Sequence, residues 1–194
     1  MSASELPLFP LRVVLYPGAH LPLRIFERRY LDLVRECARN DSGFGVCLVT
    51  DGDGGPAGHA RIGTVAHIRD WYTLDDGLLG ITAEGGGRFA VRDTQARDNG
   101  LLIGTVDWLG EPPPASVPEE FAVLSQVAGR FIEQLGEHYP DHHPDDLQDA
   151  AWVGFRLAEW LPLEPAEKQT LLELNDPLDR LRALLEILPR FQAA

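Results

Sequence analysis

A run of three prolines near the middle of the chain restricts its fold more than any other feature. Residues 112–114 are all proline, and proline lacks the backbone N–H that the interior of a helix or of a central strand requires. Glycines and prolines separate short apolar segments before the run, whereas leucines recur at helical spacings after it. We therefore expect a β-rich domain over residues 1–110 and a helical domain over residues 115–194.

The apolar segments of the first domain have the length of β-strands and are bounded by turn residues. They lie at residues 6–18, 45–50, 63–68 and 101–109. Asp76-Gly77 favours a tight turn, so it predicts a hairpin between a strand ending near residue 74 and the segment 78–83.

One helix is predicted inside this domain, over residues 27–39, because apolar side chains recur there at spacings of three and four. The residues of its apolar face are Tyr30, Leu31, Val34 and Ala38. We expect the helix to cross an open end of the sheet.

The triple glycine at residues 85–87 lies between two predicted strands. No helix follows to receive an anion, so a phosphate-binding loop is disfavoured and a tight connection between strands is expected. Arg88, the next residue, is either a surface charge or a structural donor to a nearby carbonyl or carboxylate.

The second domain has the pattern of a helical bundle, and the whole chain is therefore an α+β protein. Helices are expected at residues 121–135, at residues 145–160, and after Pro165 and Pro177, since proline is favoured in a first helical turn. Ser116 and Glu119 have the spacing of a capping box before the first of them.

The charge distribution argues against nucleic acid as a partner. The net charge is −13, and Lys168 is the only lysine, whereas nucleic-acid binding draws most of its affinity from basic side chains on phosphates. Glu167 and Gln169 flank Lys168, so the chain contains no GxxxxGK[ST] phosphate loop. The amphipathic sequence around Lys168 predicts an exposed helix face rather than a catalytic dyad.

No catalytic motif is recognisable. Neither Ser42 in NDSGF nor Ser125 in VLSQV lies in the GxSxG elbow of a serine hydrolase. Cys37 and Cys47 lack CxxC spacing and are expected to be buried, reduced thiols. We therefore predict that the protein is not an enzyme and has no cofactor.

The densest group of possible metal ligands is the sequence EHYPDHHPDD between two predicted helices. Its members are His138, Asp141, His142 and His143. Pro140 keeps His138 and His142 from sharing a regular helix face. The expected structure is a solvated loop with no metal, and a metal-binding or pH-sensing role is the alternative.

The amino-terminal residues have neither a basic segment nor a continuous apolar segment, and no run of about 18 apolar residues occurs in the chain. Secretion and membrane spanning are therefore not expected. The protein is predicted to be cytoplasmic and without a membrane partner.

Residues 6–30, LPLFPLRVVLYPGAHLPLRIFERRY, resemble the opening of the Lon protease N-terminal, or substrate-binding, domain family. Later segments resemble the family in the same order: GTVAHI at 63–68, the Asp76-Gly77 hairpin, EGGGRFAV at 84–91, and residues 157–188. The resemblance covers nearly the whole chain. It implies a PUA-like β-barrel for residues 1 to about 110 and a C-terminal α-helical bundle after it.

The resemblance also implies a function in binding protein. In full-length Lon this domain helps to hold substrates for an ATPase ring and a Ser-Lys protease, and the chain stops before either could begin. The implied activity is therefore ATP-independent binding of unfolded or exposed protein segments by a free-standing module. A separate protease or chaperone is a candidate partner.

Five residues are proposed as peptide contacts, because aromatic and arginine side chains are the usual anchors of protein interfaces. They are Phe26, Arg29, Tyr30, Trp71 and Tyr72. For Phe26 and Tyr30 the competing interpretation is that they pack the helix on the sheet, and Trp71 and Tyr72 have a packing alternative as well.

Three other functions stay open on the sequence. A PUA-like barrel is similar to RNA-binding domains, so a nucleic-acid binder is one alternative. A small-ligand protein or enzyme with an unrecognised site is the second, and it predicts a deep pocket with convergent polar groups. A purely structural or assembly role is the third.

Overall fold

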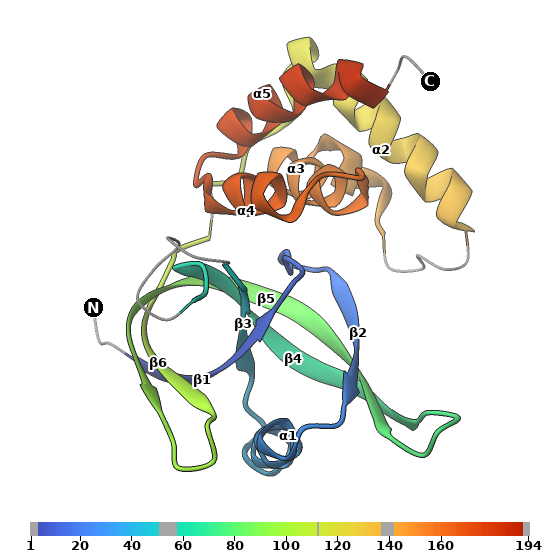
Figure 1. Ribbon diagram of the computed structural model, residues 1–194. Coiled ribbons are helices and arrows are strands. Elements are labelled where there is room, and N and C mark those ends of the chain that lie inside the picture. The colour runs from blue at the N-terminus through green and yellow to red at the C-terminus, as the bar shows by residue number, and fades with distance from the viewer. Residues whose placement is uncertain (1–3, 51–57, 112, 137–141, 192–194) are drawn as a thin grey trace. The chain divides into compact units, whose positions relative to one another are not determined.

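The computed structural model divides the chain into two compact units, residues 1–111 and 112–194 (Figure 1). The residues that it describes are 4–50, 58–111, 113–136 and 142–191. The division falls beside the proline run.

The first unit contains six strands and helix α1, Arg28–Asn40, within its described residues. The strands are β1 (Ser4–Leu11), β2 (His20–Ile25), β3 (Phe44–Leu48), β4 (Ile62–Thr73), β5 (Leu79–Ala96) and β6 (Leu102–Trp108). They form one mixed sheet in the order β2-β5-β4-β3-β1-β6, in which β1 and β3 are parallel and the other pairs are antiparallel.

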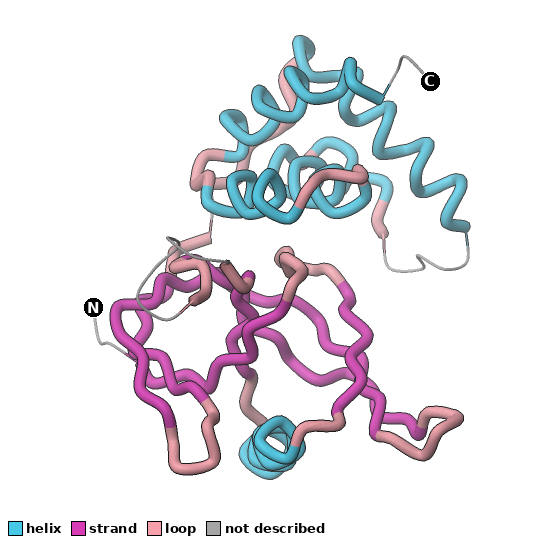
Figure 2. The backbone as a smooth tube through the Cα atoms, viewed as in Figure 1, coloured by secondary structure: helices cyan, strands magenta, loops and turns pink. Residues whose placement is uncertain are grey.

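Strand β5 makes the sheet return on itself. Its first half pairs with β2 and β4, and its second half, from Phe89 onward, pairs with β6. Because β6 also pairs with β1, the circuit β5-β4-β3-β1-β6 closes on β5. Figures 1 and 2 show the strands curving around a common centre. A register shift between Val91 and Asp93 accompanies this bend, as expected of a β-bulge.

The core of this unit lies inside the circuit. Alternate residues of a strand point to the same face, and the alternating pairs Leu6 and Leu8 on β1 and Phe89 and Val91 on β5 are all buried there. Apolar side chains are therefore supplied by strands far apart in the sequence.

The predicted hairpin is confirmed. β4 and β5 are joined by a turn in which the Leu74 N–H donates to the Leu78 carbonyl at 2.9 Å. Gly77 has φ of +82°, a conformation that costs other residues free energy because of their Cβ. The Asp76 carboxylate accepts from the Leu78 N–H at 3.1 Å.

Helix α1 is also confirmed, with a different buried face from the one predicted. Tyr30 and Val34 are buried as expected, but Leu33 and Cys37 complete the face, while Ala38 is exposed. Figure 1 shows α1 at one end of the curved sheet, as expected from the sequence.

The triple glycine is not a connection between strands, because residues 85–87 lie inside the continuous strand β5. Gly85 exchanges backbone hydrogen bonds with Gly18 and Ala19. A Cβ on Gly85 would lie 2.1 Å from the Tyr16 carbonyl oxygen. The glycine therefore permits a close approach of two backbones.

Arg88 is not a surface charge. Its side chain is 3% exposed, and burial lowers the pKa of its guanidinium.

We predict that Gly85→Ala will destabilise the protein by about 3 kcal/mol or more, because a backbone oxygen cannot move aside as a flexible side chain can. The matched control is Gly87→Ala, since nothing lies within 4 Å of a Cβ at that position. It should change the free energy of unfolding by less than about 0.5 kcal/mol. Urea denaturation followed by circular dichroism measures both, and equal effects would contradict the close-approach explanation.

The second unit is helical in all its regular elements within the described residues. These are η1 (Glu119–Phe121), α2 (Ala122–Leu135), η3 (Pro144–Gln148), α3 (Ala150–Trp160), α4 (Pro165–Glu173), α5 (Pro177–Ile187) and η4 (Leu188–Phe191). Helices α2, α4 and α5 confirm the predicted positions.

Two local predictions in this unit are wrong. The expected helix over residues 145–160 is two elements, because Asp149 is extended and its side chain caps α3 by accepting from the Trp152 N–H at 2.9 Å. Ser116 makes no capping box: the 3₁₀ turn begins after Pro118 without a side-chain cap. Ser116 instead bridges to Asp149.

Lys168 is also placed differently from the prediction of an exposed helix face. It is half-buried, and its Nζ donates to the Glu159 carbonyl at 2.6 Å. Burial lowers the pKa of this lysine, with Glu159 opposing the shift. The only lysine therefore helps to join α3 to α4.

A buried arginine holds the carboxyl end of α4. Arg180 on α5 is fully buried, and its Nε donates to the Leu171 carbonyl at 2.9 Å while its Nη2 donates to the Leu174 carbonyl. The guanidinium carbon lies 3.9 Å from the centre of the Phe155 ring. Arg180 thus supplies donors to carbonyls that a helix end leaves unsatisfied.

We predict that Arg180→Met will lower the free energy of unfolding by about 1–3 kcal/mol, because it leaves buried carbonyls without donors. Arg182→Met is the matched control: Arg182 is exposed and pairs with Asp179 on its own helix, so its loss should cost about 0.5 kcal/mol or less. Helical circular dichroism during urea denaturation would measure both. A neutral Arg180→Met variant would contradict the role assigned to the guanidinium.

None of the described helices combines the length and apolarity that a bilayer crossing requires.

Candidate functional site

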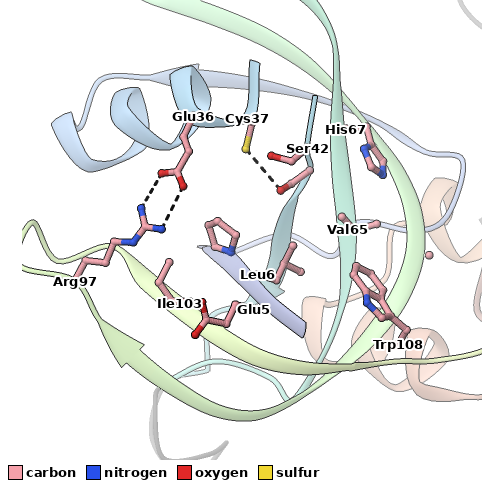
Figure 3. Close-up of a pocket in the computed structure, with 13 residues that line it drawn as sticks. Glu5, Leu6, Glu36, Cys37, Ser42, Val65, His67, Arg97, Ile103 and Trp108 are labelled. Atoms are coloured by element: carbon pink, nitrogen blue, oxygen red, sulfur yellow. Dashed lines mark hydrogen bonds and ion pairs between the residues drawn. The ribbon is translucent and has the colours of Figure 1, made fainter. Parts of the chain in front are cut away.

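Two adjoining cavities lie in the first unit, beside helix α1. Their volumes are about 610 and 410 Å³, within the size range typical of ligand sites. Both are lined by Cys37, Ser42 and His67, so they share one wall. We call the combined depression the α1–β4 groove; Figure 3 shows its larger cavity.

The groove exists because β3 is shorter than its neighbours. β3 begins at Phe44, so it pairs with β4 only at residues 64–66 and with β1 only from Leu8 onward. Among the described residues, no strand lies between β1 and β4 on the far side of Phe44. Residues 5–7 of β1, the two residues before β3, and the carboxyl half of α1 line the opening instead.

Two contacts attach α1 to the turn between β5 and β6. Arg97 donates two hydrogen bonds to the Glu36 carboxylate, at 2.7 and 3.3 Å (Figure 3). Arg29 donates to the Gly100 carbonyl at 3.2 Å. The hydrogen bond from Arg97 lowers the pKa of Glu36, so the pair is ionised at neutral pH. These contacts set the position of one wall of the groove.

An exposed tryptophan lies on either side of the shared wall. Trp71 on β4 is 43% exposed and lines the smaller cavity, and Trp108 on β6 is 44% exposed and lines the larger one. Trp108 is held by an edge contact with Phe89, at 6.2 Å between ring centres, and by donation from its Nε1 to Ser4 Oγ at 3.3 Å. His67 is exposed between the two cavities.

The three contacts predicted in IFERRY do not line either cavity. Phe26 is 65% exposed on the connection between β2 and α1. Tyr30 is 7% exposed and stacks on Phe9 with ring centres 3.7 Å apart, and burial raises its pKa. Arg29 is half-buried, with its guanidinium 4.6 Å from the centre of the Tyr30 ring.

Trp71 and Tyr72 are neighbours with different surroundings. Tyr72 is half-buried and covers Gly80, where a Cβ would lie 2.2 Å from its ring. Its hydroxyl donates to the Ile81 carbonyl at 3.4 Å. Of the five predicted contacts, only Trp71 therefore lines the groove.

Sequence reasoning missed the other groove residues, notably His67, Trp108, Glu36 and Arg97. Trp108 could have been predicted from its strand. It follows buried Gly104 and Val106 at alternate positions, so it lies on the same face of β6. An aromatic side chain at that place is expected at the mouth of a curved sheet. The Glu36–Arg97 pair had no local signal, since 61 positions separate the two residues.

The groove does not have the chemistry of a nucleophilic site at Cys37. This thiol is buried with its sulfur 3.6 Å from the Gly43 carbonyl, and burial raises its pKa despite a hydrogen bond with Ser42. A reactive cysteine needs the opposite shift, because the thiolate is the nucleophile. The predicted burial of Cys37 and Cys47 as free thiols is confirmed.

Metal ligation is not indicated in the part of the chain that the structure describes, where no group of three or more His, Cys, Asp or Glu side chains could hold an ion. His142 and His143 are exposed. His138 and Asp141 lie outside the described residues.

We predict slow alkylation of both cysteines by iodoacetamide at pH 8. Burial raises the pKa of Cys47 to about 12, which lowers its thiolate fraction about a thousandfold relative to an ordinary thiol. Mass spectrometry should show unmodified native protein and rapid double labelling in urea, with Cys37→Ser and Cys47→Ser assigning the two sites. Fast labelling of folded Cys37 would contradict its protected environment.

A family profile described as the ATP-dependent protease La (LON) substrate-binding domain matches residues 5–190. Among curated relatives, Lon protease of Roseiflexus castenholzii is 32% identical over 204 residues, and Lon protease of Cytophaga hutchinsonii is 25% identical over 197. These alignments cover 95% and 96% of this chain. The chain spans 24% of the length of each relative.

Solved structures show the same fold over nearly the whole chain. The Lon N-terminal domain protein from Xanthomonas campestris is 43% identical, with a TM-score of 0.80 over 94% of this chain and 98% of that one. The N-terminal domain of a Mycobacterium avium complex Lon protease is 17% identical, with a TM-score of 0.67 over 94% and 97%. The fold is therefore Lon N-terminal-like.

Proposed function

The chain belongs to the family of the LON substrate-binding domain, and we propose that it is a protein- or peptide-binding module that holds exposed segments of unfolded proteins. The observation that carries the proposal is the α1–β4 groove, with one exposed tryptophan on either side of its shared wall. Partly exposed tryptophans beside a cavity are typical of binding hot spots.

The groove offers both kinds of contact that an unfolded segment needs. Its apolar surface comes from Trp71, Trp108 and Ile103, and its polar groups include His67 and Ser42. Such a mixture accommodates varied sequences, because apolar side chains supply affinity while polar groups engage the peptide backbone.

Of the contacts expected from the sequence, we propose Trp71 as the main anchor and Phe26 as an outlying one. We assign Arg29, Tyr30 and Tyr72 to supporting this surface. The packing of Tyr30 on Phe9 and of Tyr72 over Gly80 favours that assignment.

The finer features of the proposal rest on the family. We propose that the closed strand circuit is a PUA-like barrel, that the protein works in the cytoplasm without ATPase or protease activity of its own, and that a separate protease or chaperone receives what it binds. The match of the substrate-binding family profile to residues 5–190 supports the binding part of this proposal.

The arginines of the first unit favour protein over nucleic acid. Several already pair with carboxylates: Arg24 with Asp76, Arg69 with Glu84, Arg92 with Asp107, and Arg97 with Glu36. Phosphate binding would have to compete with these pairs, and the net charge of −13 opposes it further.

We predict that the protein will bind reduced, carboxymethylated α-lactalbumin, which stays unfolded in native buffer, and not native α-lactalbumin. Trp71→Ala and Trp108→Ala should each weaken binding about tenfold, as expected for interface tryptophans. Phe26→Ala should have a smaller effect. Fluorescence anisotropy of labelled α-lactalbumin measures the dissociation constants.

The matched control is Val13→Ala, because Val13 is 46% exposed and lies outside the groove lining. Circular dichroism must first show that every variant is folded, above all Trp108→Ala, whose ring contacts Phe89. Absence of binding by the unaltered protein would refute the proposed function. Equal losses in all variants would refute the assignment of the groove.

A further inference from the structure

Strand β4 has one edge that no strand covers in the described part of the protein. β3 covers that edge only as far as Ala66, while β4 continues to Thr73 and pairs over residues 67–73 with β5 alone. An uncovered edge presents backbone N–H and carbonyl groups in the spacing that another strand would use. Residues 67, 68, 69 and 71 of this stretch also line the smaller cavity.

The backbone N–H of Trp71, on this stretch of β4, bonds to a side chain rather than to another strand. In the described structure the Trp71 N–H donates to the carboxylate of Asp70, the preceding residue, at 2.8 Å and not to a carbonyl of another strand. The side chain of Asp70 therefore occupies the place where the carbonyl of an added strand would lie.

We propose that an extended segment of the bound polypeptide adds to β4 as a further strand, along the edge formed by residues 67–73. This inference rests on the proposed function and specifies its binding mode. Backbone hydrogen bonds would supply affinity without regard to sequence, and alternate side chains of the segment would point to the same face. One set of these side chains would enter the smaller cavity beside Trp71.

The features of the edge favour a foreign polypeptide over a second copy of this protein. No residue of β5 lies opposite Arg69 in the pairing of β4 with β5, so Arg69 forms a bulge next to charged Asp70. Bulges and charges at an edge discourage pairing of two identical edges. A flexible unfolded segment can adjust to the bulge, whereas a second rigid β4 would have to match it.

The first test is hydrogen exchange followed by NMR, with and without carboxymethylated α-lactalbumin. Binding should slow the exchange of alternate amides in residues 67–73, including Trp71, and leave the amides of residues 79–84, which are already inside the sheet, unchanged. Binding without protection of residues 67–73 would overturn this inference and leave the proposed function standing. No binding at all would overturn both.

The second test uses backbone N-methylation. Overlapping peptides of α-lactalbumin are screened, and the tightest binder is synthesised again with N-methyl groups on alternate residues, in both possible phases. In an added strand only one alternate set of the peptide's N–H groups faces β4. One N-methylated peptide should therefore lose binding and the other should keep it. Equal binding by both would overturn strand addition.

The third test compares Asp70→Ala with Trp71→Ala. Removing the Asp70 carboxylate frees the Trp71 N–H for the peptide, so affinity should rise about threefold, whereas Trp71→Ala should lower it. The control for charge is Asp75→Ala, which is exposed on the nearby turn. An equal gain with Asp75→Ala, or protection of residues 67–73 that appears with protein concentration alone, would contradict the proposal.

Discussion

The continuity of β5 is the constraint on which the first unit depends. This strand pairs with β2, β4 and β6 along its length and thereby closes the circuit. β5 can run past residues 16–19 because Gly85 lets its backbone approach the Tyr16 carbonyl. The same strand pairs with β4, which carries Trp71, and with β6, which carries Trp108.

Elements encoded by neighbouring residues were predictable. Asp76-Gly77 specifies its turn through one positive φ angle, and Pro165 and Pro177 mark the first turns of their helices. The prediction for the triple glycine was wrong because the backbone that requires a glycine at position 85 is that of Tyr16, 69 positions away. Local sequence patterns indicate that a glycine matters without indicating which distant backbone it approaches.

The candidate site was less predictable than the fold, because it arises where a strand is missing. The opening depends on the register at which β3 begins, and on a helix attached to a turn 61 residues further along the chain. Trp71 was predicted as an aromatic side chain near a turn, yet Tyr72 has the same signal and packs over Gly80. Only burial distinguishes the two residues.

The attachment of α1 makes the groove responsive to its surroundings. Glu36 and Arg97 are both substantially exposed, so dissolved ions screen their attraction and the pair contributes little in concentrated salt. The pKa of Glu36 is lowered in the folded protein, so the contribution is present above the ordinary carboxyl pKa and is lost as acid protonates the group. Concentrated salt and acid therefore both weaken the attachment of α1, and with it the support of one wall of the groove.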